Sequence, residues 1–219
     1  MSGESLTLHC VVLAAGAARR FGSPKQLARH GGRSLLQAAV ERAQAVAGPA
    51  VTVVVGAHAA QVVPSLGPTT ARILLNRQWD EGIGSSIRAA ALAVDGHCDG
   101  VLLTLADQAA LRVEDLQRLV AAWRADGQHI VAARYGGTSG APVLFPAWCL
   151  PALASCRGES GAQRVLRAYP DKVIHVPLQR AALDVDRPED LIAVEREIGL
   201  GVDGDTGAQG HPAGGIAEL

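Results

Sequence analysis

Aromatic residues are scarce in this chain: three tryptophans, two tyrosines and two phenylalanines make up 3% of its 219 residues, and there is one methionine. Hydrophobic residues still make up 48%, so a large core is available, and it has to be built from valine, leucine, isoleucine and alanine. Such a core is typical of a parallel sheet covered by helices on both faces, because the strands of that sheet are buried on both sides.

The chain also lacks an excess of charge of either sign. Its 20 basic residues oppose 21 acidic ones, which gives a net charge of -1. A protein that binds nucleic acid through its phosphates carries a basic excess, so we expect no nucleic-acid partner.

Metal-binding cysteine pairs and targeting segments are absent as well. The four cysteines form no Cys-x-x-Cys pair, which argues against a zinc site and suits reduced thiols. They are Cys10, Cys98, Cys149 and Cys156. Met1–Thr7 is polar and does not resemble a signal peptide, and no apolar run approaches the length of a membrane span. We therefore expect a cytoplasmic protein with no membrane partner.

Short β-branched runs alternate with longer helical patterns along the chain, which predicts one doubly wound, mainly parallel Rossmann-like sheet in an α/β fold. The predicted strands are His9–Leu13, Val51–Val55, Ala71–Leu75, Val101–Leu105, His129–Ala133, Pro142–Phe145 and Lys172–Val176. The predicted helices are Ser34–Val46, Ala57–Ser65, Ser85–Val94, Val113–Ala125, Gly161–Ala168 and Pro188–Ile198. No helix precedes Pro142–Phe145, so this strand is a candidate for an antiparallel one.

The first strand leads into a small-residue loop, LAAGAARRFGSPKQL, at Leu13–Leu27. Gly16 and Gly22 permit backbone conformations that other residues avoid, and Arg20 and Lys25 bring two cations to the loop. Free backbone N–H groups and cations at the carboxyl end of a strand suit a triphosphate. The loop matches neither the Walker A pattern nor GxGxxG. The alternative interpretation is an ordinary strand–helix turn with solvated cations.

Two acidic segments follow later strands. Asp107 lies just past an apolar strand, where open α/β sheets bind ligands, and a helix that starts near Arg112–Glu114 begins too late for Asp107 to cap it. Asp184 and Asp186 alternate in an extended stretch, so their side chains point to opposite sides. Carboxylates at such an edge suit Mg²⁺, which prefers a few carboxylates plus phosphate oxygens.

A further block, NRQWDEGIGSSIRAAAL, places Ser85 and Ser86 at a helix start. There they suit either a bound polar group or plain helix capping by Ser85. The three tryptophans are interpreted as packing residues and the histidines His30, His58 and His97 as surface residues; the tryptophans are Trp79, Trp123 and Trp148.

Taken in order, these blocks resemble the MobA-like NTP transferase superfamily, and within it most closely the molybdenum cofactor cytidylyltransferase branch. The resemblance covers nearly everything from His9 to Ile198. The family motifs LAAGxSxRMGxPKxL, NxxWxxGxxxSL, LxDQP, GxxGHPVLF, LxGDxGAR and DIDTPEDL each have a counterpart. This chain departs from them at Ala18, Phe21, Ala109, Ala141, Glu159–Ser160 and Arg187.

The resemblance implies a nucleotide-diphospho-sugar transferase type of fold and a Mg²⁺-dependent enzyme. It would transfer CMP from CTP, or the corresponding unit from another NTP, to the phosphate of molybdenum-molybdopterin, a phosphorylated pterin, and release pyrophosphate. The implied catalytic residues are Lys25, Arg20 and Asp107, and the implied metal ligands are Asp107 and Asp186. The implied nucleotide-binding residues are Leu13, Ala14, Ala15, Gly16, Arg20, Lys25, Ser86 and Asp107.

Two alternatives remain open at this point: a transferase with another phosphorylated acceptor, and a non-catalytic carrier of the molybdenum cofactor. The resemblance also implies transient contact with a molybdoenzyme or its maturation factor. It divides residues 1–200 into a nucleotide-binding half, about 8–110, and an acceptor-binding half, about 111–200. Residues 201–219 are rich in glycine and poor in large apolar residues, which predicts a disordered tail.

Ending the chain at Leu200 is therefore expected to leave its melting temperature and its turnover nearly unchanged, because the removed residues lack core-forming side chains. Thermal unfolding and turnover of the shortened and the full chain measure this. A large fall in either would mean that the segment packs against the domain or gates its site.

Overall fold

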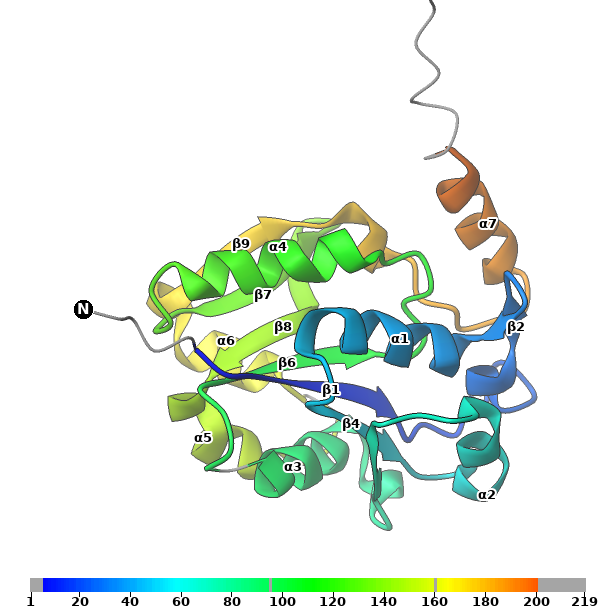
Figure 1. The fold of residues 1–219 in the computed structure, drawn as a ribbon, viewed down its shortest axis with the longest axis horizontal. Helices are drawn as coiled ribbons and strands as arrows, with labels where there is room; N and C mark the ends of the chain where they lie inside the picture. The colour runs from blue at the N-terminus through cyan, green and yellow to red at the C-terminus, as the bar shows by residue number, and fades with distance from the viewer. Residues whose placement is uncertain (1–5, 95, 160, 201–219) are drawn as a thin grey trace, which may run out of the picture.

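A computed structural model describes residues 6–94, 96–159 and 161–200. One seven-stranded sheet runs through it in the order β5-β4-β1-β6-β8-β7-β9 (Figure 1). The predicted disorder of residues 201–219 lies outside the described residues. The strands are β1 (Leu8–Ala14), β4 (Val51–Val55), β5 (Arg72–Leu75), β6 (Gly100–Leu105), β7 (Ile130–Tyr135), β8 (Thr138–Pro146) and β9 (Val173–Pro177).

The sheet is mainly parallel, as the sequence predicts. β1 pairs with β4 and β6 in parallel, and β4 with β5 and β7 with β9 do the same. β8 is antiparallel to both of its neighbours, which confirms the expectation for the strand with no helix before it. The carboxyl ends of β1, β4 and β6 therefore meet at one edge of the sheet.

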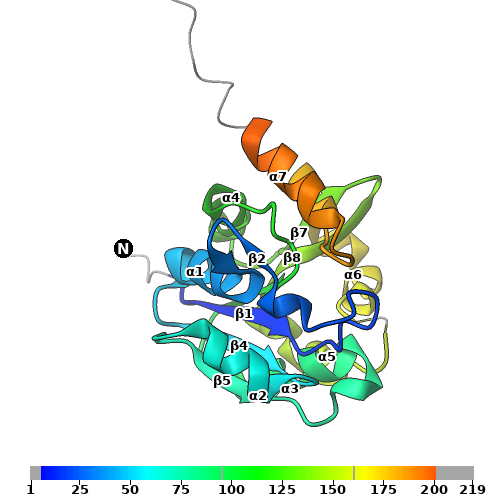
Figure 2. The same cartoon turned by 90° about the vertical axis from the view of Figure 1, so that its right-hand side faces the viewer.

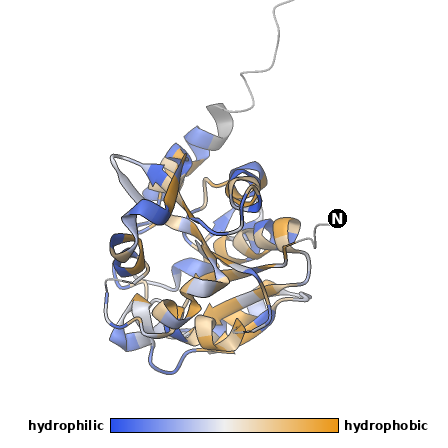
Figure 3. Ribbon diagram, turned by 90° about the vertical axis from the view of Figure 1, so that its left-hand side faces the viewer, coloured by the Kyte–Doolittle hydropathy of each residue, from blue (hydrophilic) through white to orange (hydrophobic). Residues whose placement is uncertain are grey.

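Helices cover both faces of the sheet, and alternate residues of each strand serve the two faces. In β1, Cys10 and Val12 join one core cluster and Val11 and Leu13 join the other. The first face holds α1 (Leu35–Ala47), α2 (Ala59–Val62) and α4 (Val113–Arg124); the second holds α3 (Ile83–Val94), α5 (Leu150–Ala154) and α6 (Gln163–Ala168). In Figure 3 the helices carry both hydrophilic and hydrophobic colours while the strands are mostly hydrophobic.

The last helix, α7 (Asp190–Leu200), projects from the body at the side of the hairpin formed by β2 (Arg29–His30) and β3 (Arg33–Ser34) (Figure 2). A small third core cluster packs its Val194 against Leu35, Ala110 and Val185. This cluster joins the segment after β6 to the segment before α7, which are the two acidic segments of the sequence.

The differences from the predicted elements are local. The predicted helix Ala57–Ser65 breaks into α2 and a 3-10 turn, because Pro64 removes an N–H donor. Helix α5 was missed since it has five residues and contains Pro151. The hairpin of β2 (Arg29–His30) and β3 (Arg33–Ser34) was missed for the same shortness. The 3-10 turns are η1 (Lys25–Leu27), η2 (Val63–Leu66), η3 (Trp79–Glu81), η4 (Ala147–Cys149), η5 (Pro170–Lys172) and η6 (Gln179–Ala182).

Within the three described ranges, the helices are all too short or too polar to cross a membrane.

Replacement of Gly100 by alanine is expected to destabilise the fold. Gly100 lies in β6, and a Cβ there would fall inside contact distance of the indole ring of Trp123, a fully buried residue of α4. Overpacking of a filled core costs about 1–3 kcal/mol. Thermal unfolding measures the effect, with Trp123→Phe and the double variant as controls. Because the smaller ring leaves room for the methyl group, the double variant should lose less than the sum of the two single losses; strictly additive losses would contradict this packing.

Candidate functional site

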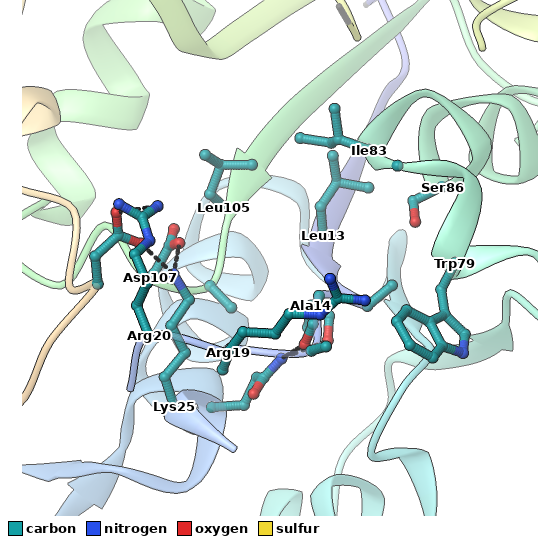
Figure 4. Close-up of a pocket in the computed structure, with 18 of the residues that line it drawn as sticks. Leu13, Ala14, Arg19, Arg20, Lys25, Trp79, Ile83, Ser86, Leu105 and Asp107 are labelled. Atoms are coloured by element: carbon teal, nitrogen blue, oxygen red, sulfur yellow. Dashed lines mark hydrogen bonds and ion pairs between the residues drawn. The ribbon is translucent and has the colours of Figure 1, made fainter. Parts of the chain in front are cut away.

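One pocket of about 430 Å³ opens at the carboxyl ends of β1 and β6 (Figure 4). All of the site residues predicted from the sequence line it: Leu13, Ala14, Ala15, Gly16, Arg20, Lys25, Ser86, Asp107 and Asp186. They come from four separate segments of the chain, and the parallel arrangement of β1 and β6 brings the first and third of these together. The structure thus places the predicted residues at one site.

The side chain of Gln26 anchors the loop after β1 through two hydrogen bonds. Its side-chain Nε2 donates to the carbonyl oxygens of Ala14 and Gly16, at 2.9 Å each, and the residue is only 4% exposed. Ala18 adopts a left-handed conformation with φ of 52°, which costs an alanine energy and shows how tightly the loop turns. The two hydrogen bonds from Gln26 therefore fix the path of the loop backbone at Ala14 and Gly16.

His58 also contacts this loop. Its Nε2 lies 3.1 Å from the carbonyl oxygen of Ala17, and the residue is half-buried. His58, predicted as a surface residue, is thus partly exposed in the turn between β4 and α2 and contacts the loop as well.

Lys25 lies between the two predicted carboxylates. Its Nζ is 2.5 Å from Asp107 Oδ2 and 2.9 Å from Asp186 Oδ1, while Arg20 contacts the other oxygen of Asp186 at 2.8 Å. Burial alone would lower the pKa of Lys25, but the charges and hydrogen bonds of Asp107 and Asp186 outweigh burial and raise it. The hydrogen bond from Lys25 and the nearby positive charges lower the pKa of Asp186.

The two acidic segments are joined through the backbone. The N–H of Val185 donates to the carbonyl oxygen of Asp107 at 3.0 Å. The side chain of the fully buried Gln108 donates to the carbonyl oxygens of Ala141 and Ala181. These bonds fix the spacing of the segment after β6 and the segment before α7, and so the spacing of Asp107 and Asp186.

The helix-capping alternative for Asp107 fails in the structure. Helix α4 begins at Val113, and the carboxylate of Asp115 accepts from the Arg112 N–H at its start. Asp184, the other acidic residue of the second segment, does not line the pocket. Partial removal of its carboxyl group from water raises the pKa of Asp184 to about 6, and the charge of Asp107 adds to this.

The carboxylate pair fits a hard divalent cation. Oδ1 of Asp107 is buried and has no hydrogen-bond partner in the described residues, so it is an anionic oxygen with an open coordination position. No group of three or more His, Cys, Asp or Glu side chains in those residues is arranged to hold a metal. Two carboxylates alone suit Mg²⁺, which commonly takes its remaining ligands from phosphate oxygens and water.

The opposite end of the pocket is formed by the segment from β5 into α3. Asn76 follows β5 directly, and its Nδ2 donates to the hydroxyl oxygens of Ser85 and Ser86 at 2.8 and 3.0 Å. Trp79 packs against the second core cluster, as expected, but it also lines the pocket, which the sequence did not indicate (Figure 4).

Other lining residues were missed from the sequence: Arg19, Gln26, Leu35, Ile83 and Glu159. For Gln26 a signal existed, since it directly follows Lys25 within the same loop.

Of the positions that depart from the family motifs, Ala141, Glu159–Ser160 and Arg187 lie in residues 111–200. At position 141 the family motif has a histidine, and this chain has alanine. The carbonyl oxygen of Ala141 accepts a hydrogen bond from the Gln108 side chain, so the backbone at this position still has a structural role. Glu159 reaches the pocket, and Gly82 has no room for a Cβ because the backbone of Gly158 lies against it. Burial and the charges of Asp184 and Asp107 raise the pKa of Tyr135, whose hydroxyl lies over Gly140.

A small-residue loop with three cationic residues, Arg19, Arg20 and Lys25, beside paired carboxylates at the carboxyl edge of a parallel sheet is typical of an α/β nucleotide-binding protein. The chain belongs to the MobA-like NTP transferase domain family, whose domain matches residues 10–173.

The chain is similar to three known proteins, the third of them in fold. Nicotine blue oxidoreductase from Paenarthrobacter nicotinovorans is 34% identical over 171 residues, which cover 73% of this chain and 81% of the relative. A crystal structure of the Mycobacterium sp. strain JC1 homologue of Mycobacterium tuberculosis Rv0371c aligns with a TM-score of 0.76 and 29% identity, covering 86% of this chain and 97% of that one. A nucleotidyl transferase from Methanothermobacter, 19% identical, shares the fold with a TM-score of 0.74 and coverage of 89% and 99%.

Replacement of Gln26 by alanine is expected to weaken nucleotide binding about 10-fold, because two hydrogen bonds that shape the loop are lost at roughly 1 kcal/mol or less each. Calorimetric titration with CTP in the presence of Mg²⁺ measures it. Gln44→Ala is the matched control, since the Gln44 side chain binds only the exposed Thr69 and Thr70 hydroxyls on the far side of α1. Equal affinities of the Gln26 and Gln44 variants would remove the role given to Gln26.

Proposed function

We propose that this protein is a Mg²⁺-dependent cytidylyltransferase that moves CMP from CTP to the phosphate of molybdenum-molybdopterin. The observation that carries the proposal is the position of Lys25, at the end of the loop after β1, between Asp107 and Asp186. Transfer of a phosphoryl group needs cations that neutralise the phosphates and carboxylates that hold a metal ion, and the loop after β1 and the two aspartates supply both. A non-catalytic carrier of the cofactor would have no need for paired carboxylates.

In this mechanism, Lys25, Arg20 and the loop N–H groups hold the triphosphate. An oxygen of the acceptor phosphate attacks the α-phosphorus, a new oxygen–phosphorus bond forms, and the bond to the β-phosphate breaks to release pyrophosphate. The chain acts by positioning the reactants and neutralising their charge. Asp107 and Asp186 would hold Mg²⁺, which, when bound, supplies further neutralisation of the phosphate charges. An acceptor phosphate is ionised near neutral pH, so no general base is required.

The preference for CTP rests on Ala15, which lines the pocket. By the family resemblance, members that transfer guanylyl groups carry glycine at this position. A methyl group in a pocket discriminates by about 1–3 kcal/mol, so a moderate preference over GTP is expected. The preference for a phosphorylated pterin as acceptor rests on the family resemblance alone.

Localisation in the cytoplasm and transient contact with a molybdoenzyme or its maturation factor are part of the same proposal. None of the four cysteines, which all lie in the described residues, forms a disulfide, and burial raises the pKa of the Cys10 and Cys149 thiols to about 12. Thiols of that kind are inert, which suits a reducing compartment.

The test is pyrophosphate release by the purified protein with each of the four NTPs, Mg²⁺ and molybdenum-molybdopterin. Release with CTP above GTP is the expected result. Release with other phosphorylated acceptors alone would support the wider transferase interpretation. No release with any pair, with binding of the cofactor intact, would point to a carrier.

Asp107→Asn and Asp186→Asn are each expected to abolish most turnover, and the double variant should be little worse than either single one. Asparagine keeps the shape of the side chain but removes the charge that binds a hard cation, and after one loss little remains for the second to remove.

Steady-state rates across a Mg²⁺ titration measure these effects. Asp171→Asn, at an exposed position in η5, is the matched control and should match the unmodified protein. Multiplicative losses in the double variant would argue against a shared metal, and full activity of Asp186→Asn would move the assignment to Asp184.

A further inference from the structure

The hydrogen bonds around Asn76 determine which way its side-chain amide faces. The backbone N–H of Gln78 donates to Asn76 Oδ1 at 2.9 Å. An N–H group can only donate, so the atom facing it is the oxygen, and the Nδ2 group therefore faces Ser85 and Ser86. The Asn76 side chain is nearly fully buried at 4% exposure, which holds this orientation.

With the amide fixed, the two serine hydroxyls have different remaining capacities. Both oxygens accept from Nδ2 of Asn76. The Ser85 hydroxyl then donates its proton to the carbonyl oxygen of Gly82 at 2.8 Å. The Ser86 hydroxyl has no acceptor in the described part of the chain. Its proton is consequently left for a ligand.

The position of Ser86 decides where that proton is offered. Ser86 lines the pocket, whereas Ser85 does not. Its hydroxyl lies beside Trp79 and Ile83 (Figure 4), at the end of the pocket away from Lys25 and the carboxylates. If the phosphates occupy the charged end, the base of the nucleotide occupies this one.

We propose that Asn76 is a positioning residue that makes the Ser86 hydroxyl a hydrogen-bond donor to a carbonyl oxygen of the nucleobase. The pocket then favours nucleotides whose base carries such a carbonyl, which cytosine, uracil and guanine have and adenine lacks. The inference rests on the proposed function in that the ligand of this pocket is a nucleoside triphosphate.

The direct test inverts the polarity of the Asn76 side chain. In Asn76→Asp a carboxylate of nearly the same shape replaces the amide, and it accepts from Ser86 instead of donating to it. The Ser86 proton turns towards the new carboxylate, and the hydroxyl presents its lone pairs to the base. CTP binding, titrated calorimetrically with Mg²⁺ and without an acceptor, is expected to weaken about 10-fold, the size of one lost hydrogen bond plus a mismatch.

A double-mutant cycle with Ser86→Ala separates positioning from a structural role. Ser86→Ala should weaken CTP binding by about the same factor, and Asn76→Asp should add nothing in the Ser86→Ala background, because the group it reorients is gone. ATP binding should change little in any of these variants. Equal losses on Asn76→Asp in both backgrounds, or unchanged CTP binding in Asn76→Asp, would overturn the proposal.

Two further variants keep the result interpretable if Asn76→Asp is unstable. Asn76→Ala lets the Ser86 hydroxyl rotate freely, so CTP binding should weaken less than in Asn76→Asp; a loss that only follows the melting temperature across the variants would indicate a structural role. Ser85→Ala is the matched control: it removes a hydroxyl bound to the same amide, and its CTP affinity should equal that of the unmodified protein.

The cycle also separates this inference from the proposed function. Binding of CTP by the unmodified protein together with insensitivity to Asn76→Asp removes the inference alone. Absence of binding for CTP, UTP, GTP and ATP by the unmodified protein removes both.

Discussion

The contact of Lys25 with Asp107 and Asp186 is the constraint on which the rest of the site depends, because it joins three segments that are far apart in the sequence. Two like charges held at one point repel each other, and a cation between them is what makes their approach stable. Hydrogen bonds to the backbone keep these residues in place. The Gln26 side chain donates to the loop that carries Lys25, and the N–H of Val185 donates to the carbonyl oxygen of Asp107. In a transferase, phosphate oxygens would take the place of the carboxylates beside Lys25, and a metal ion would take the place of Lys25 beside Asp107 and Asp186.

Much of the fold was predictable from the sequence, since the strands contain apolar runs such as Val51–Val55 and Val101–Leu105, which alternate with helical patterns. Asp107 was predictable as a site residue because it follows such a run at the ligand-binding edge. The short α5 was not predictable, since five residues with a proline carry no helical period. Gln26 and Asn76 could not be assigned tasks from sequence either, because their partners are backbone and hydroxyl groups that only the folded chain brings near.

The departures from the family motifs affect the two halves of the pocket differently. In the nucleotide half, Ala18 occupies a tight left-handed turn, and the charged residues of the loop remain in place. In the acceptor half, Ala141 serves through its backbone, and Glu159 brings an acidic group to the pocket. The departures therefore fall in both halves of the chain: Ala18, Phe21 and Ala109 lie in the first half, and Ala141, Glu159–Ser160 and Arg187 in the second.

The most direct test of the account is a crystal structure of the protein with CTP and Mn²⁺, in which anomalous scattering locates the metal without reference to activity. We expect one anomalous peak within coordination distance of both Asp107 and Asp186. The triphosphate should lie along the loop from Ala14 to Lys25, and the base should lie beside Ser86. A metal peak away from both carboxylates, or a nucleotide bound outside this pocket, would contradict it.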